Sequence, residues 1–326
     1  MLHQPPRYPL ACLPTPLHRL PGLERRLGGP QLWIKRDDLT GLGGGGNKVR
    51  KLELLVADAQ AQEAETLITT GAVQSNHARQ TAAAAARAGL GAVLVLAPMA
   101  PPTITGNLLL DHLVGARIRW TGDRDRYELM QEIADEERAA GRNPYIIPYG
   151  GSNAIGAAAY ALAMQELAQQ QEAMGISFSH VVFATSSGGT QAGLVTGALA
   201  TGWEGTVLGI SVDKPADVLA PSVLELARLT ATYLGIEQVP QMAHVHVNGD
   251  YRGAGYAIMG APEREAIRLV AESEGLLVDP VYTGRAMAGL MDLVRKGDLG
   301  KKDRVLFWHT GGTPALFAYA DELLAE

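Results

Sequence analysis

Residues 35–53 read KRDDLTGLGGGGNKVRKLE, a glycine-rich turn between an apolar run at residues 31–35 and a helical pattern at residues 50–60. Five of the six residues from 41 to 46 are glycine, which adopts the backbone conformations that tight turns require. The turn delivers one lysine, Lys48, to the start of the helix. Amide groups at a helix start lower the cost of a neutral amine, and a neutral lysine can form an imine.

Other interpretations compete for this turn. Gly41, Gly43 and Gly46 have the spacing of a dinucleotide-binding fingerprint, but that motif follows its strand directly, and here the charged residues 35–38 intervene. A phosphate loop of the Gly-Lys-Ser/Thr type is excluded because Lys48 lies between asparagine and valine. The stretch by itself leaves open whether Lys48 is an ordinary solvated lysine or an imine-forming one.

Apolar runs alternate with helical patterns along the chain. Short runs of β-branched and apolar residues predict buried strands at residues 31–35, 66–70, 92–96, 180–184, 206–212 and 304–309. Helical patterns occupy residues 50–60, 78–88, 127–140, 155–171, 262–274 and 284–295. This alternation is typical of α/β proteins and predicts open, twisted parallel sheets with helices on both faces.

Two polar turns lie between a predicted strand and a predicted helix, where free backbone amides can bind anions. In the turn at residues 74–77, Ser75 and Asn76 are candidates for capping the next helix, with a substrate carboxylate in front of it. In the turn Ser187-Gly188-Gly189-Thr190, small residues let amide groups converge on a phosphate, and hydroxyls add donors. A plain cap and a tight turn without a ligand are the alternatives.

Two further polar turns follow apolar runs near the end of the chain. The first contains Tyr282 and Thr283, and the second contains Thr310 within the run His-Thr-Gly-Gly-Thr-Pro. Open α/β sheets bind their ligands at the carboxyl ends of strands. We therefore expect all these turns to cluster around one site.

Taken together, the five stretches resemble the pyridoxal-phosphate family of D-cysteine desulfhydrase and aminocyclopropane-carboxylate deaminase, which has the tryptophan-synthase-β-like fold, PLP fold type II. The likeness runs from about residue 16 to the C-terminus. It implies an enzyme with pyridoxal 5'-phosphate bound to Lys48 as a Schiff base. It also implies a small amino acid as substrate and a homodimer as the assembly.

The resemblance assigns further residues to the cofactor. Lys51 and the turn of Ser187, Gly188, Gly189 and Thr190 match positions that bind the phosphate. Asn76 matches the partner of the phenolic oxygen. Thr283 and Thr310 match two positions near the pyridine ring.

The resemblance also predicts the residues that act on the substrate. Ser75 matches a residue near the substrate carboxylate that takes part in catalysis, and Gln74, Asn76 and His77 belong to the same substrate-binding stretch. Tyr282 and Tyr256 match two active-site tyrosines.

Thr283 and Thr310 relate the chain to the desulfhydrase branch of the family. The deaminase branch has an acid after the strand-end tyrosine, where it pairs with the ring nitrogen, and it reads His-Leu-Gly-Gly in the last stretch. A neutral hydroxyl makes the ring a weaker electron sink, which is adequate for β-elimination because the leaving group departs from Cβ. We therefore predict conversion of D-cysteine to pyruvate, sulfide and ammonia, with Lys48 as base and Tyr282 as acid.

Three alternative functions stay open at this point. The first is removal of sulfite from L-cysteate, for which His77 and Arg285 supply basic side chains. The second is deamination of 1-aminocyclopropane-1-carboxylate. The third is a non-catalytic protein that binds anionic metabolites in the same turns.

The resemblance further predicts two α/β domains with the cofactor between them. Residues 1–50 and 159–326 form the large cofactor-binding domain. Residues 51–158 form a smaller inserted domain that closes over the substrate.

Composition limits the partners of the protein. The chain has 28 basic and 34 acidic residues, a net charge of −6 and no basic block, so we expect no nucleic-acid partner. No run of about 18 apolar residues and no leader segment occurs, so we expect no membrane span and a cytoplasmic location.

The single cysteine, Cys12, cannot form an internal disulfide and is expected to be a small buried hydrophobe. His244 and His246 alternate as on one strand, but no third ligand is near, so no metal is expected.

Overall fold

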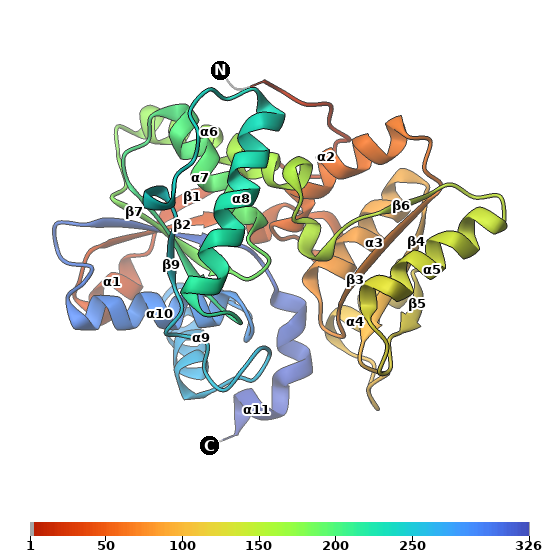
Figure 1. The fold of residues 1–326 in the computed structure, drawn as a ribbon. Helices are drawn as coiled ribbons and strands as arrows, with labels where there is room; N and C mark the ends of the chain where they lie inside the picture. Colours follow the sequence, from red (N-terminus) through yellow and green to blue (C-terminus); the bar gives the residue numbers. More distant parts are fainter. Residues whose placement is uncertain (1–2, 326) are drawn as a thin grey trace.

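The computed structural model describes residues 3–325, which contain a six-stranded and a four-stranded β-sheet (Figure 1). The six-stranded sheet has the order β1-β2-β10-β7-β8-β9, and the four-stranded sheet has the order β5-β4-β3-β6. The strands are β1 (Leu17–Arg19), β2 (Gln31–Arg36), β3 (Thr66–Ala72), β4 (Gly91–Ala97), β5 (Arg117–Trp120), β6 (Pro144–Ile146), β7 (His180–Thr185), β8 (Thr206–Ser211), β9 (His246–Asn248) and β10 (Arg304–His309).

Helices cover both faces of each sheet, as the alternation in the sequence predicts. The α-helices are α1 (Pro21–Leu27), α2 (Lys48–Ala61), α3 (Asn76–Ala88), α4 (Gly106–Leu113), α5 (Arg126–Ala139), α6 (Ala154–Met174), α7 (Gly189–Thr201), α8 (Ala216–Leu234), α9 (Ala261–Glu274), α10 (Thr283–Lys296) and α11 (Ala320–Leu324). Short 3-10 helices are η1 (Asp37–Leu39), η2 (Leu42–Gly44), η3 (Tyr149–Gly151), η4 (Met242–His244) and η5 (Thr313–Tyr319).

The central strands of the large sheet are buried on both sides. Side chains alternate between faces along a strand, so Val182 and Phe307 pack into a core with α1, α9 and α10. Their neighbours Phe183 and Trp308 pack into a second core with α6, α7 and α8. Continuous apolar runs of this kind are typical of parallel strands covered by helices, which is why the sequence identified β7 and β10.

The small sheet has the same design on a smaller scale. In β3, Leu67 faces a core with α2, α3 and α4, while Ile68 faces α5. Helices α2 and α6 join the two sheets and pack against each other, with Leu54 of α2 against Ala158 and Ala161 of α6. The domain boundaries that we expect at residues 50/51 and 158/159 fall inside these two helices. We keep the division into two domains as a proposal.

Some elements differ from the sequence-based expectation. Strand β1 pairs antiparallel with β2, so the large sheet is not parallel throughout. Strands β1, β5, β6 and β9 and helices α1, α4, α8 and α11 were not predicted, and α7 was expected after the Ser187 turn without bounds. The strands have only three or four residues, and the first ten residues of α7 are all buried, polar ones included, so neither shows a clear periodicity.

Three predictions outside the site can also be compared with the structure. Cys12 is exposed, not buried, because the segment before β1 runs over the surface. His244 lies in η4 and accepts a hydrogen bond from the backbone of Gln241, whereas His246 begins β9, so the two do not share a strand face. Among residues 3–325, no helix is both long and apolar enough to cross a membrane.

Candidate active site

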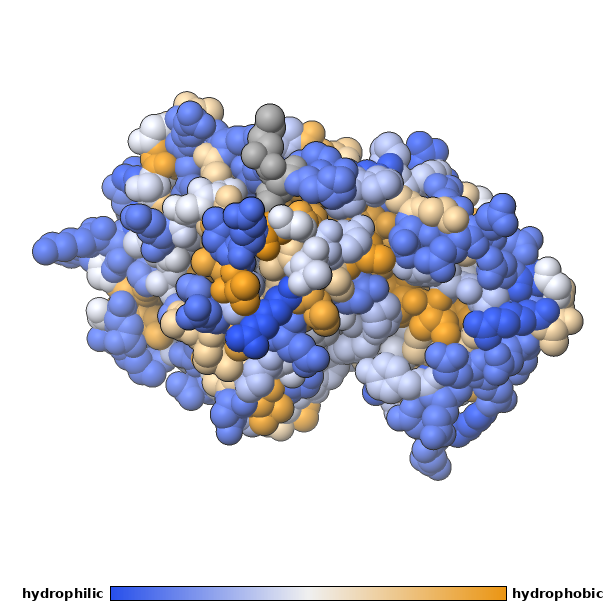
Figure 2. Space-filling view, turned by 45° about the horizontal axis from the view of Figure 1, so that its top comes forward, coloured by the Kyte–Doolittle hydropathy of each residue, from blue (hydrophilic) through white to orange (hydrophobic). Residues whose placement is uncertain are grey.

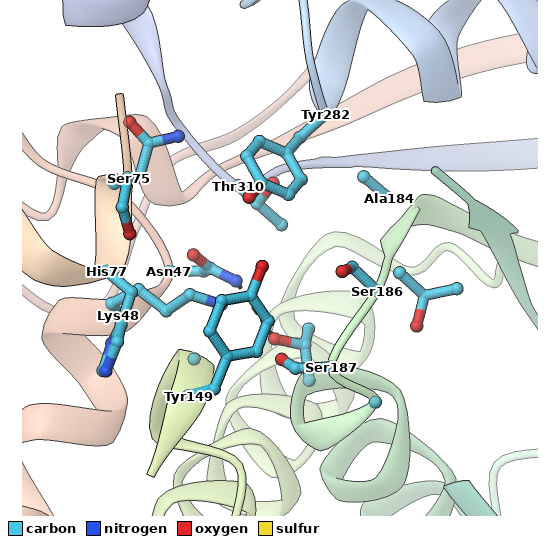
Figure 3. A pocket seen from close by; sticks show the side chains of 15 residues that line it. Asn47, Lys48, Ser75, His77, Tyr149, Ala184, Ser186, Ser187, Tyr282 and Thr310 are labelled. Atoms are coloured by element: carbon cyan, nitrogen blue, oxygen red, sulfur yellow. Dashed lines mark hydrogen bonds between the residues drawn. The ribbon is translucent and has the colours of Figure 1, made fainter. Parts of the chain in front are cut away.

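A pocket lies where β3, β7 and β10 end, between the two sheets. Figure 2 shows that the molecular outline is notched between a larger and a smaller part of the molecule. The turns that the sequence predicts to cluster do meet in this pocket, since predicted site residues from all of them line it (Figure 3): Lys48, Ser75, Asn76, His77, Ser187, Gly188, Thr190, Tyr282 and Thr310. Other predicted residues lie behind this lining, namely Lys51, Gln74, Gly189, Tyr256 and Thr283.

Lys48 is the first residue of α2, and its side chain extends into the pocket (Figure 3). Glycine is required in the turn before it, since Gly45 has φ +71° and an added Cβ would lie 2.0 Å from the Asp38 carbonyl oxygen. Burial lowers the pKa of the Lys48 amine to about 8. A substantial fraction of this amine is therefore uncharged and nucleophilic near neutral pH.

A buried carboxylate holds the lysine turn in place. Asp37 accepts hydrogen bonds from the Arg50 guanidinium at 2.8 Å, the Trp308 indole at 2.8 Å and the Tyr160 hydroxyl at 2.5 Å. The backbone oxygen of Asp37 accepts from the amide of Gly46. These bonds join the turn to α2, α6 and β10, so several independent elements fix the position of Lys48.

The start of α7 has the features of a phosphate site. Gly188 caps the helix at φ +81°, and an added Cβ on Gly189 would lie 2.5 Å from Ser152 Oγ and 2.8 Å from Lys51 Nζ. The amine of Lys51 donates to the Gly150 carbonyl oxygen at 3.1 Å. A helix N-terminus and a buried amine therefore meet at one glycine-lined turn, which is the arrangement that binds phosphate groups.

The two predicted threonines differ in what their hydroxyls do. The Thr283 hydroxyl is wholly buried and donates to Asp279 Oδ1 at 2.6 Å, so it holds the turn before α10. Thr310 lines the pocket, and no hydrogen bond occupies its hydroxyl within residues 3–325. The structure thus gives Thr283 a role in supporting the turn, and it leaves Thr310 as the hydroxyl that can meet a cofactor ring.

Ser75 and Asn76 begin α3 as their sequence suggests. Ser75 is the N-cap, and its Oγ accepts from the amide of Ala78 at 3.1 Å, which leaves the hydroxyl proton free to donate. Asn76 is the first helical residue and is also buried. Gln74 does not line the pocket, and its side-chain amide donates to the Thr105 carbonyl at 3.1 Å, so it fastens the turn; contact of Gln74 with the substrate stays a prediction.

His77 lines the pocket as a neutral side chain. The Thr69 hydroxyl donates to the Ile147 carbonyl at 2.9 Å, so it must accept from Nε2 of His77, also at 2.9 Å. Burial, followed by the charges of Lys48 and Lys51, lowers the pKa of His77 well below its ordinary value. His77 therefore contributes polarity to the pocket but no positive charge.

Three tyrosine hydroxyls gather on the other side of the pocket. The hydroxyls of Tyr256 and Tyr282 lie 2.5 Å apart, with the rings edge to face. Tyr149, from η3 after the small sheet, reaches the same place from the opposite wall (Figure 3). Burial raises the pKa of all three tyrosines, so their hydroxyls stay protonated near neutral pH.

Sequence reasoning missed several residues of this site. Tyr149 and Ser152 lie near a 3-10 turn that no strand or helix pattern marks, and only the tertiary structure brings them to Lys48 and the α7 turn. Asn47 donates from its side chain to the Thr190 hydroxyl at 3.0 Å. Its place directly before Lys48 is the one sequence signal that could have identified it.

Pyridoxal phosphate, which the sequence predicts, fits the residues present. The Gly189 turn forms a cradle that a Cβ would fill, next to the amine of Lys51. The hydroxyl of Thr185, which lines the pocket, is buried and has no hydrogen-bond partner in the described part of the chain. Lys48, the α7 turn and Thr310 could hold the aldehyde, phosphate and ring nitrogen of the cofactor respectively.

Comparisons with known proteins agree with this arrangement. The family model described as "Pyridoxal-phosphate dependent enzyme" matches residues 9–311. A Pyrococcus furiosus protein, provisionally named 1-aminocyclopropane-1-carboxylate deaminase, is 42% identical over 100% of this chain and 97% of its own. D-cysteine desulfhydrase of Salmonella newport is 42% identical over 96% of each chain. A crystal structure of an "ACC deaminase homologue" has a TM-score of 0.91 and 42% identity, covering 98% of this chain and 96% of that one.

Proposed function

Since the chain belongs to the family of pyridoxal-phosphate dependent enzymes and is a lyase of the D-cysteine desulfhydrase and aminocyclopropane-carboxylate deaminase type, we propose that it cleaves D-cysteine. With one water, the reaction gives pyruvate, hydrogen sulfide and ammonia, as the Cβ–S and Cα–N bonds break. The observation that carries this proposal is that, in the part of the chain that the structure describes, hydroxyls such as that of Thr310 and no carboxylic acid line the pocket where a cofactor ring would lie.

Lys48 is the base in this proposal. When bound, pyridoxal phosphate supplies an aldehyde that condenses with amines and a ring that withdraws electrons from the Cα of the substrate. The amine of Lys48, with its pKa lowered to about 8 by burial, takes the Cα proton near neutral pH. The buried contacts of Asp37 keep α2 in the position that this transfer needs.

The start of α3 would bind the substrate carboxylate. The first amides of a helix have no partner within the helix, and their partial positive charge attracts an anion. The free hydroxyl proton of Ser75 adds a donor at the same point. This fits a small amino acid whose carboxylate is fixed while its Cα–H bond faces Lys48.

Tyr282 would supply the proton for the leaving group. The electron pair of the Cβ–S bond leaves with sulfur, which takes the hydroxyl proton of Tyr282. Tyr256, whose hydroxyl lies 2.5 Å away, can return a proton to it. All three tyrosines of the pocket are protonated near neutral pH, so the required acid is present.

The lack of a carboxylic acid among the pocket-lining residues that the structure describes favours β-elimination over opening of a cyclopropane ring. A carboxylic acid at the ring nitrogen keeps that nitrogen protonated and makes the ring a strong electron sink. Thr283, which stands at the position of that acid, is a neutral hydroxyl, and in the described residues Lys48 is the one charged side chain that lines the pocket once His77 is neutral. A departing thiolate carries its own electron pair, so a weaker sink is adequate.

L-Cysteate is supported less well as the substrate. That alternative depended on His77 and Arg285 as positive charges for a sulfonate, but His77 is neutral. Arg285 is buried outside the pocket, where it forms an ion pair with Glu263 and donates to the carbonyls of Val212 and Ile258. Apart from Lys48, the pocket lining within residues 3–325 therefore offers no cation to a second anionic group on the substrate.

A substrate panel tests the proposal. Purified holoenzyme is given D-cysteine, L-cysteine, L-cysteate and 1-aminocyclopropane-1-carboxylate, and pyruvate, 2-oxobutyrate, sulfide and sulfite are measured. We expect D-cysteine to exceed every competitor in kcat/KM by at least about tenfold, with equal pyruvate and sulfide. Lys48→Ala serves as the inactive control. Faster formation of 2-oxobutyrate or of sulfite would reject the assignment.

The location and the assembly of the enzyme are part of the proposal. We propose a homodimer that works in the cytoplasm. Sedimentation equilibrium of the purified holoenzyme measures the assembly directly, and a monomer mass at micromolar concentration would exclude the dimer.

A further inference from the structure

The side-chain amide of Asn76 has two ends of opposite chemistry. Its oxygen can only accept a hydrogen bond, and its nitrogen can only donate. The predicted partner of Asn76 is the phenolic oxygen of the cofactor, which accepts when it is ionised. Asn76 can bind it only if the nitrogen faces the pocket, yet the two ends have nearly the same size, so packing alone does not select the orientation.

Asn107 determines which end of the Asn76 amide faces the pocket. It is wholly buried in the first turn of α4, where its Nδ2 lies 2.9 Å from the carbonyl oxygen of Gln74 and 2.9 Å from Oδ1 of Asn76. A backbone carbonyl only accepts, so the Asn107 atom that contacts Gln74 must be the nitrogen. That nitrogen also faces Asn76, so the Asn76 atom opposite it must be the oxygen.

The nitrogen of Asn76 is therefore the end left for the pocket. Asn76 lines the pocket, and within residues 3–325 its Nδ2 makes no hydrogen bond. Asn107 itself does not line the pocket. Any effect of Asn107 on the cofactor thus passes through Asn76.

The backbone around Asn107 is built for close approach to the Gln74 turn. The amide of Asn107 donates to Gln74 Oε1 at 2.8 Å, and Gln74 Nε2 donates to the Thr105 carbonyl at 3.1 Å. Gly106 has φ +60°, and an added Cβ would lie 2.4 Å from Gln74 Oε1. Only glycine lets the two segments approach closely enough for Asn107 to reach both Gln74 and Asn76.

We propose that Asn107 is a positioning residue that fixes the amide orientation of Asn76. It ensures that the enzyme presents a donor, and not an acceptor, to the phenolic oxygen of the cofactor. The role concerns the binding and the electronic state of the cofactor and does not depend on which amino acid is the substrate.

The test uses the cofactor without any substrate. Apoenzyme is titrated with pyridoxal phosphate, and the dissociation constant and the visible absorbance maximum are measured for wild type, Asn107→Asp, Asn107→Ala and Asn76→Ala. Asn107→Asp removes the donor and places an acceptor against Asn76 Oδ1. We expect roughly tenfold weaker cofactor binding and a shifted visible band. Asn76→Ala should give the same shift, and the double variant Asn76→Ala with Asn107→Ala should add nothing further.

A matched control lies on the same helix. Asp111 is also wholly buried in α4, one turn after Asn107, and its side chain makes no hydrogen bond in the described residues. Asp111→Asn should therefore keep the wild-type band and affinity. A wild-type spectrum and affinity in folded Asn107→Asp, or additive effects in the double variant, would overturn the proposal.

A measurement on the wild-type enzyme covers the case in which the variants do not fold. Neutron diffraction from deuterated holoenzyme crystals locates the deuterium atoms of the Asn76 amide. We expect them on the atom that faces the cofactor. Deuterium on the atom that faces Asn107 would contradict the proposal. Neither test uses D-cysteine, so a different substrate would leave their outcome unchanged.

Discussion

Folding removes the amine of Lys48 from water. Within the part of the chain that the structure describes, no carboxylate lines the pocket to pair with this amine. A charged amine without a partner is costly in a buried place, so the pKa falls to about 8. Lys51 is affected in the same way, because burial, followed by the charge of Lys48, lowers its pKa well below the ordinary value. The two lysines differ in position: Lys48 faces the pocket and Lys51 faces the α7 turn.

The lowered pKa predicts how incorporation of the cofactor depends on pH. Only the uncharged amine attacks an aldehyde, and the uncharged fraction rises as the pH passes through the pKa. We expect the rate at which apoenzyme takes up pyridoxal phosphate to rise with pH and to level off slightly above pH 8. Stopped-flow absorbance from pH 6 to 10 measures it, with Lys48→Ala apoenzyme as the control. A rate that keeps rising steeply up to pH 10 would show an ordinary lysine.

At the scale of elements, the start of each helix around the pocket carries a separate function. The start of α2 carries Lys48. The start of α3 has free backbone amides that can bind a carboxylate, and the start of α7 has a glycine turn that can bind a phosphate. Each start follows the carboxyl end of a strand or a turn next to it, so the parallel strands bring them together. The anion sites thus come from backbone amides, and the pocket needs few charged side chains.

A single added methyl group at the start of α7 tests whether the phosphate of the cofactor binds there. Gly189→Ala would place a Cβ 2.5 Å from Ser152 Oγ and 2.8 Å from Lys51 Nζ, where the phosphate site lies. We expect cofactor affinity to fall by more than roughly tenfold. Gly300→Ala is the control, since an added Cβ there has no neighbour closer than 4.0 Å. Equal affinities of the two variants, measured by absorbance titration, would place the phosphate elsewhere.

Sequence reasoning succeeded where local pattern and burial coincide. β10 and α10 were predicted at residues 304–309 and 284–295, and they occupy Arg304–His309 and Thr283–Lys296, because a run buried on both faces and an amphipathic stripe are both visible in sequence. Helix α4 gives no such signal, although it carries Asn107. Tyr149 was missed for a related reason: it lines the pocket together with Tyr282 only because the fold brings their separate segments together, which local sequence does not encode.

Sequence reasoning also could not tell apart similar side chains around the pocket. The sequence suggested that both Thr283 and Thr310 contact the cofactor ring, but in the structure the Thr283 hydroxyl donates a hydrogen bond to Asp279. The sequence suggested that both Gln74 and Ser75 bind the substrate, but in the structure the side-chain amide of Gln74 is hydrogen-bonded to the backbone at the start of α4. The direction of a side chain depends on tertiary packing, and residue type alone does not determine it.

At the scale of the whole molecule, the pocket draws its walls from both sheets. Ser75 comes from α3 beside the small sheet, whereas the Ser187 turn and Tyr282 come from the large sheet, to which Asp37 also fastens the Lys48 turn. Helices α2 and α6 connect the two parts. We propose that a small rotation of one part toward the other brings Tyr149 closer to a bound substrate and excludes water.

We therefore expect the enzyme to become more compact when an amino acid binds. D-Alanine has the carboxylate and the amine of the substrate but no leaving group, so it can occupy the pocket without elimination. X-ray scattering in solution should show a smaller radius of gyration of the holoenzyme at saturating D-alanine, with L-alanine as the control. An unchanged radius, at a concentration where the visible spectrum shows binding, would exclude closure.

The central claim is that the amine of Lys48 bonds to the aldehyde of the cofactor. Treating the holoenzyme with sodium borohydride makes that bond permanent, and digestion followed by mass spectrometry identifies the lysine that carries the pyridoxyl group. We predict that the label lies on Lys48 and on no other lysine in stoichiometric amount. A label on Lys51, or an unlabelled Lys48 peptide from enzyme with its full visible absorbance, would contradict the account.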